Sequence, residues 1–81
     1  MKPVTIYTTP TCGFCKMTKE FFKENNVQYN EHDVSQDSAK AQEMVDLSGQ
    51  MGVPVVVIGE GEEKDIIVGF DEPKLKELLE F

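Results

Sequence analysis

The most apolar stretch of the chain, Val53 to Ile58, does most to limit the folds that are open to it. Apart from Pro54, it consists of valine and isoleucine, which favour β-strands, and such a run is typical of a buried strand. The glycine- and glutamate-rich segment 59–62 predicts a hairpin turn, and residues 64–68 predict a strand that returns from it. The chain therefore needs a sheet that contains a buried strand and an antiparallel pair.

The remaining segments alternate between strand and helix patterns. In chain order we expect a strand at 4–7, a helix at 13–25, a strand at 27–34, a helix between the capping residues 35–38 and Gly49, strands at 53–58 and 64–68, and a helix from Asp71 to Phe81. The first β-α-β unit requires parallel strands, and the hairpin requires antiparallel ones. An α/β fold with one mixed, four-stranded sheet and three helices (β-α-β-α-β-β-α), covered on both faces, satisfies both requirements. At 81 residues, the chain has room for a single domain, residues 1–81.

Three methionines, Met17, Met44 and Met51, are expected to pack in the interior, because their flexible side chains fill irregular gaps. Met17 is also expected to form the apolar side of the first helix, together with Phe21 and Phe22. We expect no metal-ligating role for these methionines.

Charge and hydropathy exclude several kinds of partner. The net charge of -7 disfavours binding to nucleic acid, because contacts to phosphates need a basic surface. No apolar run approaches the roughly 20 residues that span a bilayer, and the first residues lack the apolar core of a signal peptide. We therefore expect a cytoplasmic monomer with no membrane or nucleic-acid partner.

Cys12 and Cys15 are the only cysteines, and their spacing points to redox chemistry. A bridge between them would constrain little of the chain, and cytoplasmic cysteines stay reduced unless they turn over or bind a metal. The pair lies where the first strand gives way to the first helix, so free N–H groups at the helix start would stabilise a Cys12 thiolate. We expect Cys12 to be the nucleophile and Cys15, one turn later, the resolving thiol. Lys16 and Lys19 would add positive potential.

Two other uses of a Cys-x-x-Cys pair fit this sequence less well. A zinc site needs four ligands, and only His32 could join the two cysteines. Haem attachment needs a histidine directly after the second cysteine, where Lys16 stands. We expect His32 to be a partly exposed strand residue, and we predict no metal site.

Pro54 is unusual at the entrance of a buried strand, because proline cannot donate a hydrogen bond to the ladder. One explanation is that it simply begins the strand. The other is a cis peptide bond that presents the backbone N–H and C=O of Val53 to an extended thiol peptide beside Cys12. The residues alone leave both explanations open.

The chain resembles the glutaredoxins along nearly its whole length, through Tyr7 to Lys16, Ser48 to Pro54, and Gly69 to Asp71. The resemblance implies a thioredoxin-like fold, a cis Val53–Pro54 bond, and reduction of protein or glutathione mixed disulfides by the cysteine pair. It implies no tightly bound cofactor, and glutathione as a co-substrate. The residues that the resemblance places along a glutathione groove are Thr9, Phe14, Gln50, Val53, Pro54 and Asp71. In that groove Val53 would bind the cysteinyl backbone, and Asp71 with its helix start would hold the γ-glutamyl end.

Several positions depart from the usual pattern of the family. Gly13 and Phe14 replace its proline and tyrosine, and Thr9 lies where a lysine is common. Gly52 replaces its threonine, and Val68 replaces the first glycine of a pair. These changes remove contacts to glutathione, so thioredoxin reductase is the alternative reductant, as in small glutaredoxin-like electron donors to ribonucleotide reductase.

A binding function is the other alternative that the resemblance leaves open. Gly13 and Phe14 are similar to the Cys-Gly-Phe-Ser segment of glutaredoxins that carry iron–sulfur clusters, although Cys15 replaces their serine. In such a scaffold, Cys12 of two protomers and two glutathiones would hold a [2Fe–2S] cluster. A brown anaerobic preparation that absorbs visible light would favour this alternative.

Overall fold

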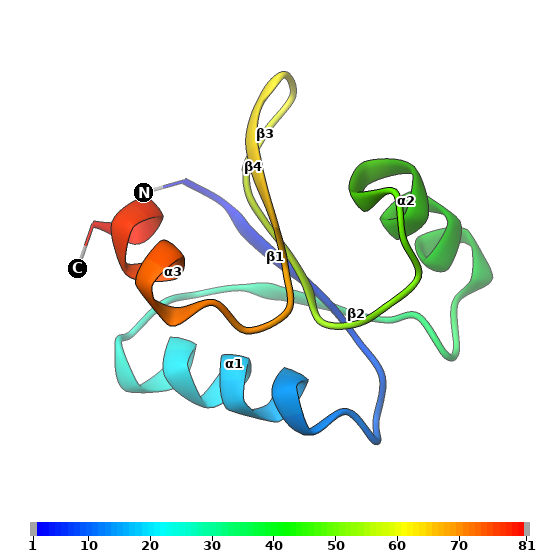
Figure 1. Ribbon diagram of the computed structural model, residues 1–81, viewed down its shortest axis with the longest axis horizontal. Coiled ribbons are helices and arrows are strands. Elements are labelled where there is room, and N and C mark those ends of the chain that lie inside the picture. The colour runs from blue at the N-terminus through cyan, green and yellow to red at the C-terminus, as the bar shows by residue number, and fades with distance from the viewer. Residues whose placement is uncertain (1, 81) are drawn as a thin grey trace.

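The computed structural model describes residues 2–80, which contain seven helices and strands in the expected order (Figure 1). They are β1 (Val4–Thr8), α1 (Gly13–Glu24), β2 (Asn30–Asp33), α2 (Ser38–Ser48), β3 (Val55–Glu60), β4 (Glu63–Val68) and α3 (Glu72–Leu79). The strands form one sheet in the order β2-β1-β3-β4. β1 is parallel to β2 and antiparallel to β3, which is antiparallel to β4. The predicted mixed sheet is confirmed.

Helices cover both faces of the sheet, with α1 and α3 on one side and α2 on the other (Figure 1). Alternate residues of β3 enter the cores on the two sides. Val56 and Ile58 pack on the side of α1 and α3, whereas Val55 and Val57 pack with Met44 of α2. Because both faces of β3 are covered, every residue at its start is apolar, as the sequence predicted.

The second strand is shorter than expected. It pairs with β1 from Asn30 onward, where the sequence pattern predicted a start at residue 27. The Val27 N–H instead donates to the Phe22 carbonyl at 2.8 Å, which closes the end of α1. Val27 is nevertheless buried, and Tyr29 packs against the core. Residues 27–29 therefore resemble a strand in sequence because their apolar side chains are buried, although their backbone does not pair with β1.

The hairpin is tighter than the predicted four-residue turn. β3 begins at Val55 and runs on to Glu60, which pairs with Glu63, so only residues 61 and 62 form the turn. Gly61 has a φ of 65°, a left-handed conformation that glycine adopts readily.

The predicted helix caps are present at α2. Asp37 accepts the Lys40 N–H at 3.1 Å to begin α2, and Gly49 ends it with a φ of 74°. Asp71 caps α3, which ends at Leu79. The predicted end of that helix, at residue 81, lies outside the described residues.

Two of the three methionine predictions are wrong. Met44 is 2% exposed, but Met17 is 47% and Met51 80% exposed. The buried residues of α1 are Cys15, Thr18, Phe21 and Phe22. Met17 lies beside this stripe instead of within it, because a helix turns about 100° per residue. Between residues 2 and 80, no helix has the length and apolar character that are needed to cross a membrane.

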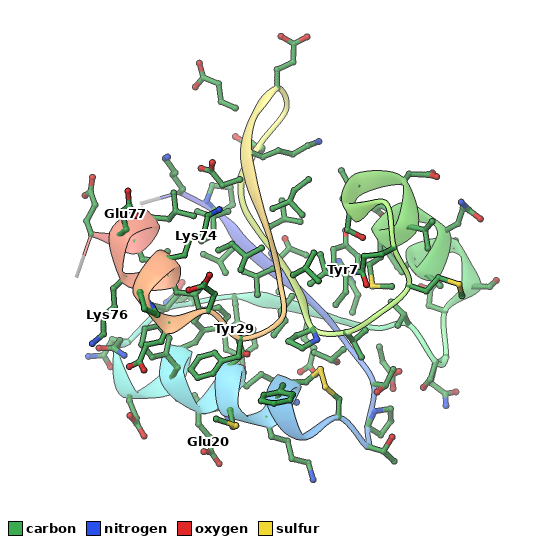
Figure 2. The ribbon with its side chains drawn as sticks, in the orientation of Figure 1. Tyr7, Glu20, Tyr29, Lys74, Lys76 and Glu77 are labelled. Carbon is green, nitrogen blue, oxygen red and sulfur yellow. A yellow bond between two sulfur atoms is a disulfide. The ribbon has the colours of Figure 1, made fainter. Side chains whose placement is uncertain are left out.

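A hydrogen bond from Tyr7 joins β1 to α2 on the face of the sheet that α2 covers (Figure 2). The Tyr7 hydroxyl donates to Glu43 Oε1 at 3.0 Å, and Lys40 Nζ donates to Glu43 Oε2 at 2.9 Å. The hydrogen bonds from Lys40 and then Tyr7 hold the pKa of Glu43 below its usual value. Burial first, and Glu43 second, raise the pKa of Tyr7 to about 12.

We predict that Tyr7→Phe lowers the free energy of unfolding by about 1 kcal/mol near neutral pH, the usual net contribution of one hydrogen bond. Because the pKa of Glu43 is lower in the folded than in the unfolded state, its bonds stabilise the fold above the unfolded pKa. That contribution is lost as the pH falls through the folded pKa, so the difference should shrink below about pH 4. Urea unfolding across this range measures it, with Tyr29→Phe as the matched control. A difference that stays constant into strong acid contradicts the prediction.

Candidate active site

Cys12 and Cys15 form a disulfide where β1 leads into α1, and their Cα atoms are 5.2 Å apart (Figure 2). Cys12 is the N-cap of α1, with an extended backbone (φ -85°, ψ 112°). Its sulfur accepts the Cys15 N–H at 3.0 Å. The Cys12 sulfur thus lies among the free N–H groups of the helix start, where a thiolate is stabilised.

The two sulfurs differ in access. Cys12 is partly exposed, whereas Cys15 is 1% exposed and packs on the buried side of α1. Attack on a disulfide of another molecule requires an accessible thiolate. The geometry therefore suits Cys12 as nucleophile and Cys15 as resolving thiol, and these roles remain predictions.

The sheet brings two other segments to the same edge as the cysteines. Tyr7 pairs with Val55, and Val55 pairs with Val68. The residues just after Tyr7, just before Val55 and just after Val68 therefore meet at one edge. The Gly69 N–H donates to the Pro54 carbonyl at 2.8 Å across this edge.

The expected cis bond between Val53 and Pro54 is present. Pro54 is fully buried, and Val53 is partly buried against the core on the α2 side. Pro54 thus precedes β3 without taking a ladder position, which begins with Val55.

The other predicted site residues make their hydrogen bonds within their own segments. The Thr9 carbonyl accepts the Cys12 N–H at 3.3 Å and shapes the turn before the disulfide. Asp71 accepts the Lys74 N–H at 3.2 Å as the cap of α3. The Gln50 side-chain amide bonds to the backbone of its own loop. Their roles in binding glutathione stay predictions.

Phe14 is 62% exposed and lines a shallow hollow of about 290 Å³ with Gly13 and Met17. This hollow lies at the start of α1, beside the disulfide. Larger hollows lie elsewhere, around Pro3 and Tyr29 and around Lys2 and Leu78. They flank the beginning of β1, and the disulfide follows its end.

Glu31 is a neighbour of the site that the sequence did not reveal. Its Oε2 accepts Lys19 Nζ at 2.9 Å and the buried Thr8 hydroxyl at 2.8 Å. The Lys19 hydrogen bond is the main reason why the pKa of Glu31 is low. Lys19 is therefore paired, and Lys16 is the exposed lysine beside the cysteines. Only the pairing of β1 with β2 identifies Glu31, because it stands far from Thr8 and Lys19 in sequence.

Comparison with known proteins decides the family. Residues 4–62 match the glutaredoxin family model. The chain belongs to the glutaredoxin family. A glutaredoxin-like 8.6 kDa protein in the rubredoxin operon of Clostridium pasteurianum, itself uncharacterized, is 42% identical over 77 residues, which are 95% of this chain and 97% of that protein.

Solved structures agree with this membership. Glutaredoxin (grx-1) of Archaeoglobus fulgidus has a TM-score of 0.84 and 31% identity, over 100% of this chain and 89% of that one. The glutaredoxin-like NrdH-redoxin of Escherichia coli, described as having a thioredoxin-like activity profile, has a TM-score of 0.75 and 25% identity, over 94% of this chain and 93% of that one. The predicted thioredoxin-like fold and family are confirmed. This glutaredoxin is a redox protein with a Cys-x-x-Cys pair.

We predict that an alkylating agent modifies Cys12 of the reduced, folded protein well before Cys15 near neutral pH. Cys12 is partly exposed at the helix start, and Cys15 is 1% exposed. Timed reaction with iodoacetamide, followed by mass spectrometry of the peptides, measures both rates. Denatured protein is the control, in which the two cysteines should react at similar rates. Equal or faster labelling of Cys15 in the folded protein would reverse the assigned roles.

Proposed function

We propose that this glutaredoxin is a dithiol oxidoreductase that reduces protein disulfides and protein–glutathione mixed disulfides. One observation carries the proposal: a partly exposed Cys12 sulfur at the N-cap of α1 is bonded to a buried Cys15 one turn later. The proposed setting is the cytoplasm, with the protein acting as a monomer.

The reaction begins with the reduced pair. The Cys12 thiolate attacks one sulfur of a substrate disulfide, so that a Cys12–substrate disulfide forms and the other substrate sulfur leaves as a thiolate. Cys15 then loses its proton and attacks the Cys12 sulfur, which releases the second substrate thiolate. The substrate gains two electrons, and the Cys12–Cys15 disulfide seen in the structure is the oxidised product.

Reduction of the pair restores the protein. Two glutathione molecules would reduce the Cys12–Cys15 disulfide in two successive exchanges and leave as glutathione disulfide. Alternatively, the reduced cysteine pair of thioredoxin reductase would reduce it and become oxidised itself. The backbone of Val53 and the helix start at Asp71 are the proposed contacts for glutathione, and the exposed ring of Phe14 would pack against it.

We further propose that glutathione is the weaker reductant. Thr9 offers no cation, Gly52 offers no hydroxyl, and Val68 places an exposed, branched side chain where the family has glycine. Lys19, one of the two lysines expected to add positive potential near the cysteines, is paired with Glu31. One lost hydrogen bond to a charged group weakens binding by about tenfold or more. The thioredoxin-like profile of the E. coli NrdH-redoxin supports thioredoxin reductase as the alternative.

The iron–sulfur scaffold remains an untested prediction. Residues 2–80 hold no group of three or more histidine, cysteine or acidic side chains suited to a metal ion. A cluster shared between two protomers and two glutathiones would not need such a group. We do not propose it, because Cys15 stands where cluster-carrying relatives have serine and is bonded to Cys12.

We predict that Cys12→Ser abolishes reduction of a protein disulfide such as that of insulin, because no accessible thiolate remains. Cys15→Ser should instead accumulate a Cys12–substrate mixed disulfide, since no thiol stands behind Cys12 to release it. Mass spectrometry of the reaction mixture detects the trapped species. Activity that survives in Cys12→Ser refutes the proposed mechanism.

We predict that Thr9→Lys raises the rate at which glutathione reduces the Cys12–Cys15 disulfide by about tenfold, through one charge-assisted hydrogen bond to a carboxylate. The rate with dithiothreitol, which carries no carboxylate, should hardly change. Gln28→Lys adds the same charge at an exposed position near the other end of the sheet and is the matched control. An equal gain in both variants would mean that general charge, and not a contact at residue 9, governs the rate.

A further inference from the structure

The side-chain amide of Gln50 is bonded within its own loop. Its Nε2 donates to the Gly52 carbonyl at 3.0 Å and to Ser48 Oγ at 3.3 Å. Its Oε1 accepts the Gly52 N–H at 2.6 Å. Ser48 in turn donates to the Met44 carbonyl at 2.7 Å, which ties the loop to the last turn of α2. We call this arrangement of Ser48, Gln50 and Gly52 the Gln50 clasp.

Gly52 is what makes room for the clasp. A Cβ atom at this position would lie 2.7 Å from Gln50 Oε1, closer than real contacts allow. Gly52 is not among the glycines with positive φ, so its backbone conformation is open to other residues. The group that a side chain here would displace is therefore the end of a flexible side chain, and the backbone need not move.

The clasp lies directly before the proposed contacts for the ligand. Gly52 precedes Val53 and Pro54, and Pro54 is bonded to Gly69 at the edge of the sheet where the cysteines lie. If the Gln50 amide were released from the clasp, its N–H groups would be free to donate to glutathione, a tripeptide with two carboxylates that is proposed to bind beside this loop. In the clasp, those N–H groups are already used by the protein.

We propose that Gly52 and Gln50 together determine specificity against glutathione: Gly52 permits the clasp, and the clasp withholds the Gln50 amide from the ligand. This inference rests on the proposed function and gives a physical cause for a weak response to glutathione. The effect of Gly52 is therefore separate from its lack of a threonine hydroxyl. Any side chain at residue 52, with or without a hydroxyl, would displace the Gln50 amide.

The test uses the rate of reduction of the Cys12–Cys15 disulfide by glutathione, divided by the rate with dithiothreitol. Dithiothreitol has no peptide or carboxylate group for an amide to bind, so the ratio removes general effects on the disulfide. Gly52→Ala should raise the ratio by about three- to tenfold, the range for one hydrogen bond. Adding Gln50→Ala to Gly52→Ala should reverse the gain. Gln50→Ala alone should change the ratio by less than about twofold, like the exposed control Met51→Ala.

Hydrogen exchange gives a readout that does not depend on activity. In the wild type the Gly52 N–H is bonded to Gln50 Oε1 and should exchange slowly for a loop amide. Gln50→Ala should speed its exchange and leave the amides of β3 and β4 unchanged. This arm needs no substitution at residue 52, so it tests the clasp even where a variant at that position fails to fold.

Three results would overturn the inference. The first is an unchanged ratio in Gly52→Ala. The second is that Gln50→Ala lowers the ratio equally in the wild type and in Gly52→Ala. The third is unaltered exchange of the Gly52 N–H in Gln50→Ala. A wild type that reduces no disulfide would refute the proposed function instead, and the exchange experiment would still report on the clasp.

Discussion

Burial of β3 on both of its faces is the constraint on which the rest of the structure depends. Val55, Val56 and Ile58 are 0% exposed, and each such side chain contributes about 1.5–3 kcal/mol when it leaves water. Covering both faces requires α1 and α3 on one side and α2 on the other. The antiparallel register then places the end of β1, which leads to Cys12, beside Pro54 at the start of β3.

Polar side chains at the surface of the two cores link the helices to the strands, and each of these links adds little to the stability of the fold. Glu43 links α2 to β1, and Glu31 links α1 to the edge strand β2. Exposed ion pairs such as Lys19–Glu31 contribute roughly 0–1 kcal/mol. Lys19 is partly neutralised by Glu31, which leaves the N–H groups at the start of α1 and the exposed Lys16 to stabilise a Cys12 thiolate.

The departures from the family pattern gather along the edge where the cysteines lie, and the fold absorbs them without change. Thr9, Gly52 and Val68 lie in or next to the three segments that meet there. None of these side chains is needed for the two cores. Under the proposed function, the scaffold keeps dithiol exchange while a few side chains, and the loop bonds that they permit, change the preference for the reductant.

Local signals in the sequence determined the order of elements, the caps of α2 within residues 35–38 and at Gly49, the buried strand, and the position of the cysteine pair at the start of a helix. The cis bond before Pro54 followed from the family resemblance, since physics alone left it open. Only the tertiary structure decided that the second strand begins at Asn30 and that Met51 is exposed.

Tertiary structure also decided the partners of Glu31 and Gln50. Glu31 meets Thr8 and Lys19 only once β2 pairs with β1 and α1 packs over them. The Gln50 amide bonds to its own loop, in space that is open because Gly52 has no side chain. Hydrophobic periodicity and helix capping depend on residues that are neighbours along the chain, so they can be predicted from the sequence. The hydrogen-bond partner of a side chain depends on which groups the packed fold brings within hydrogen-bond distance.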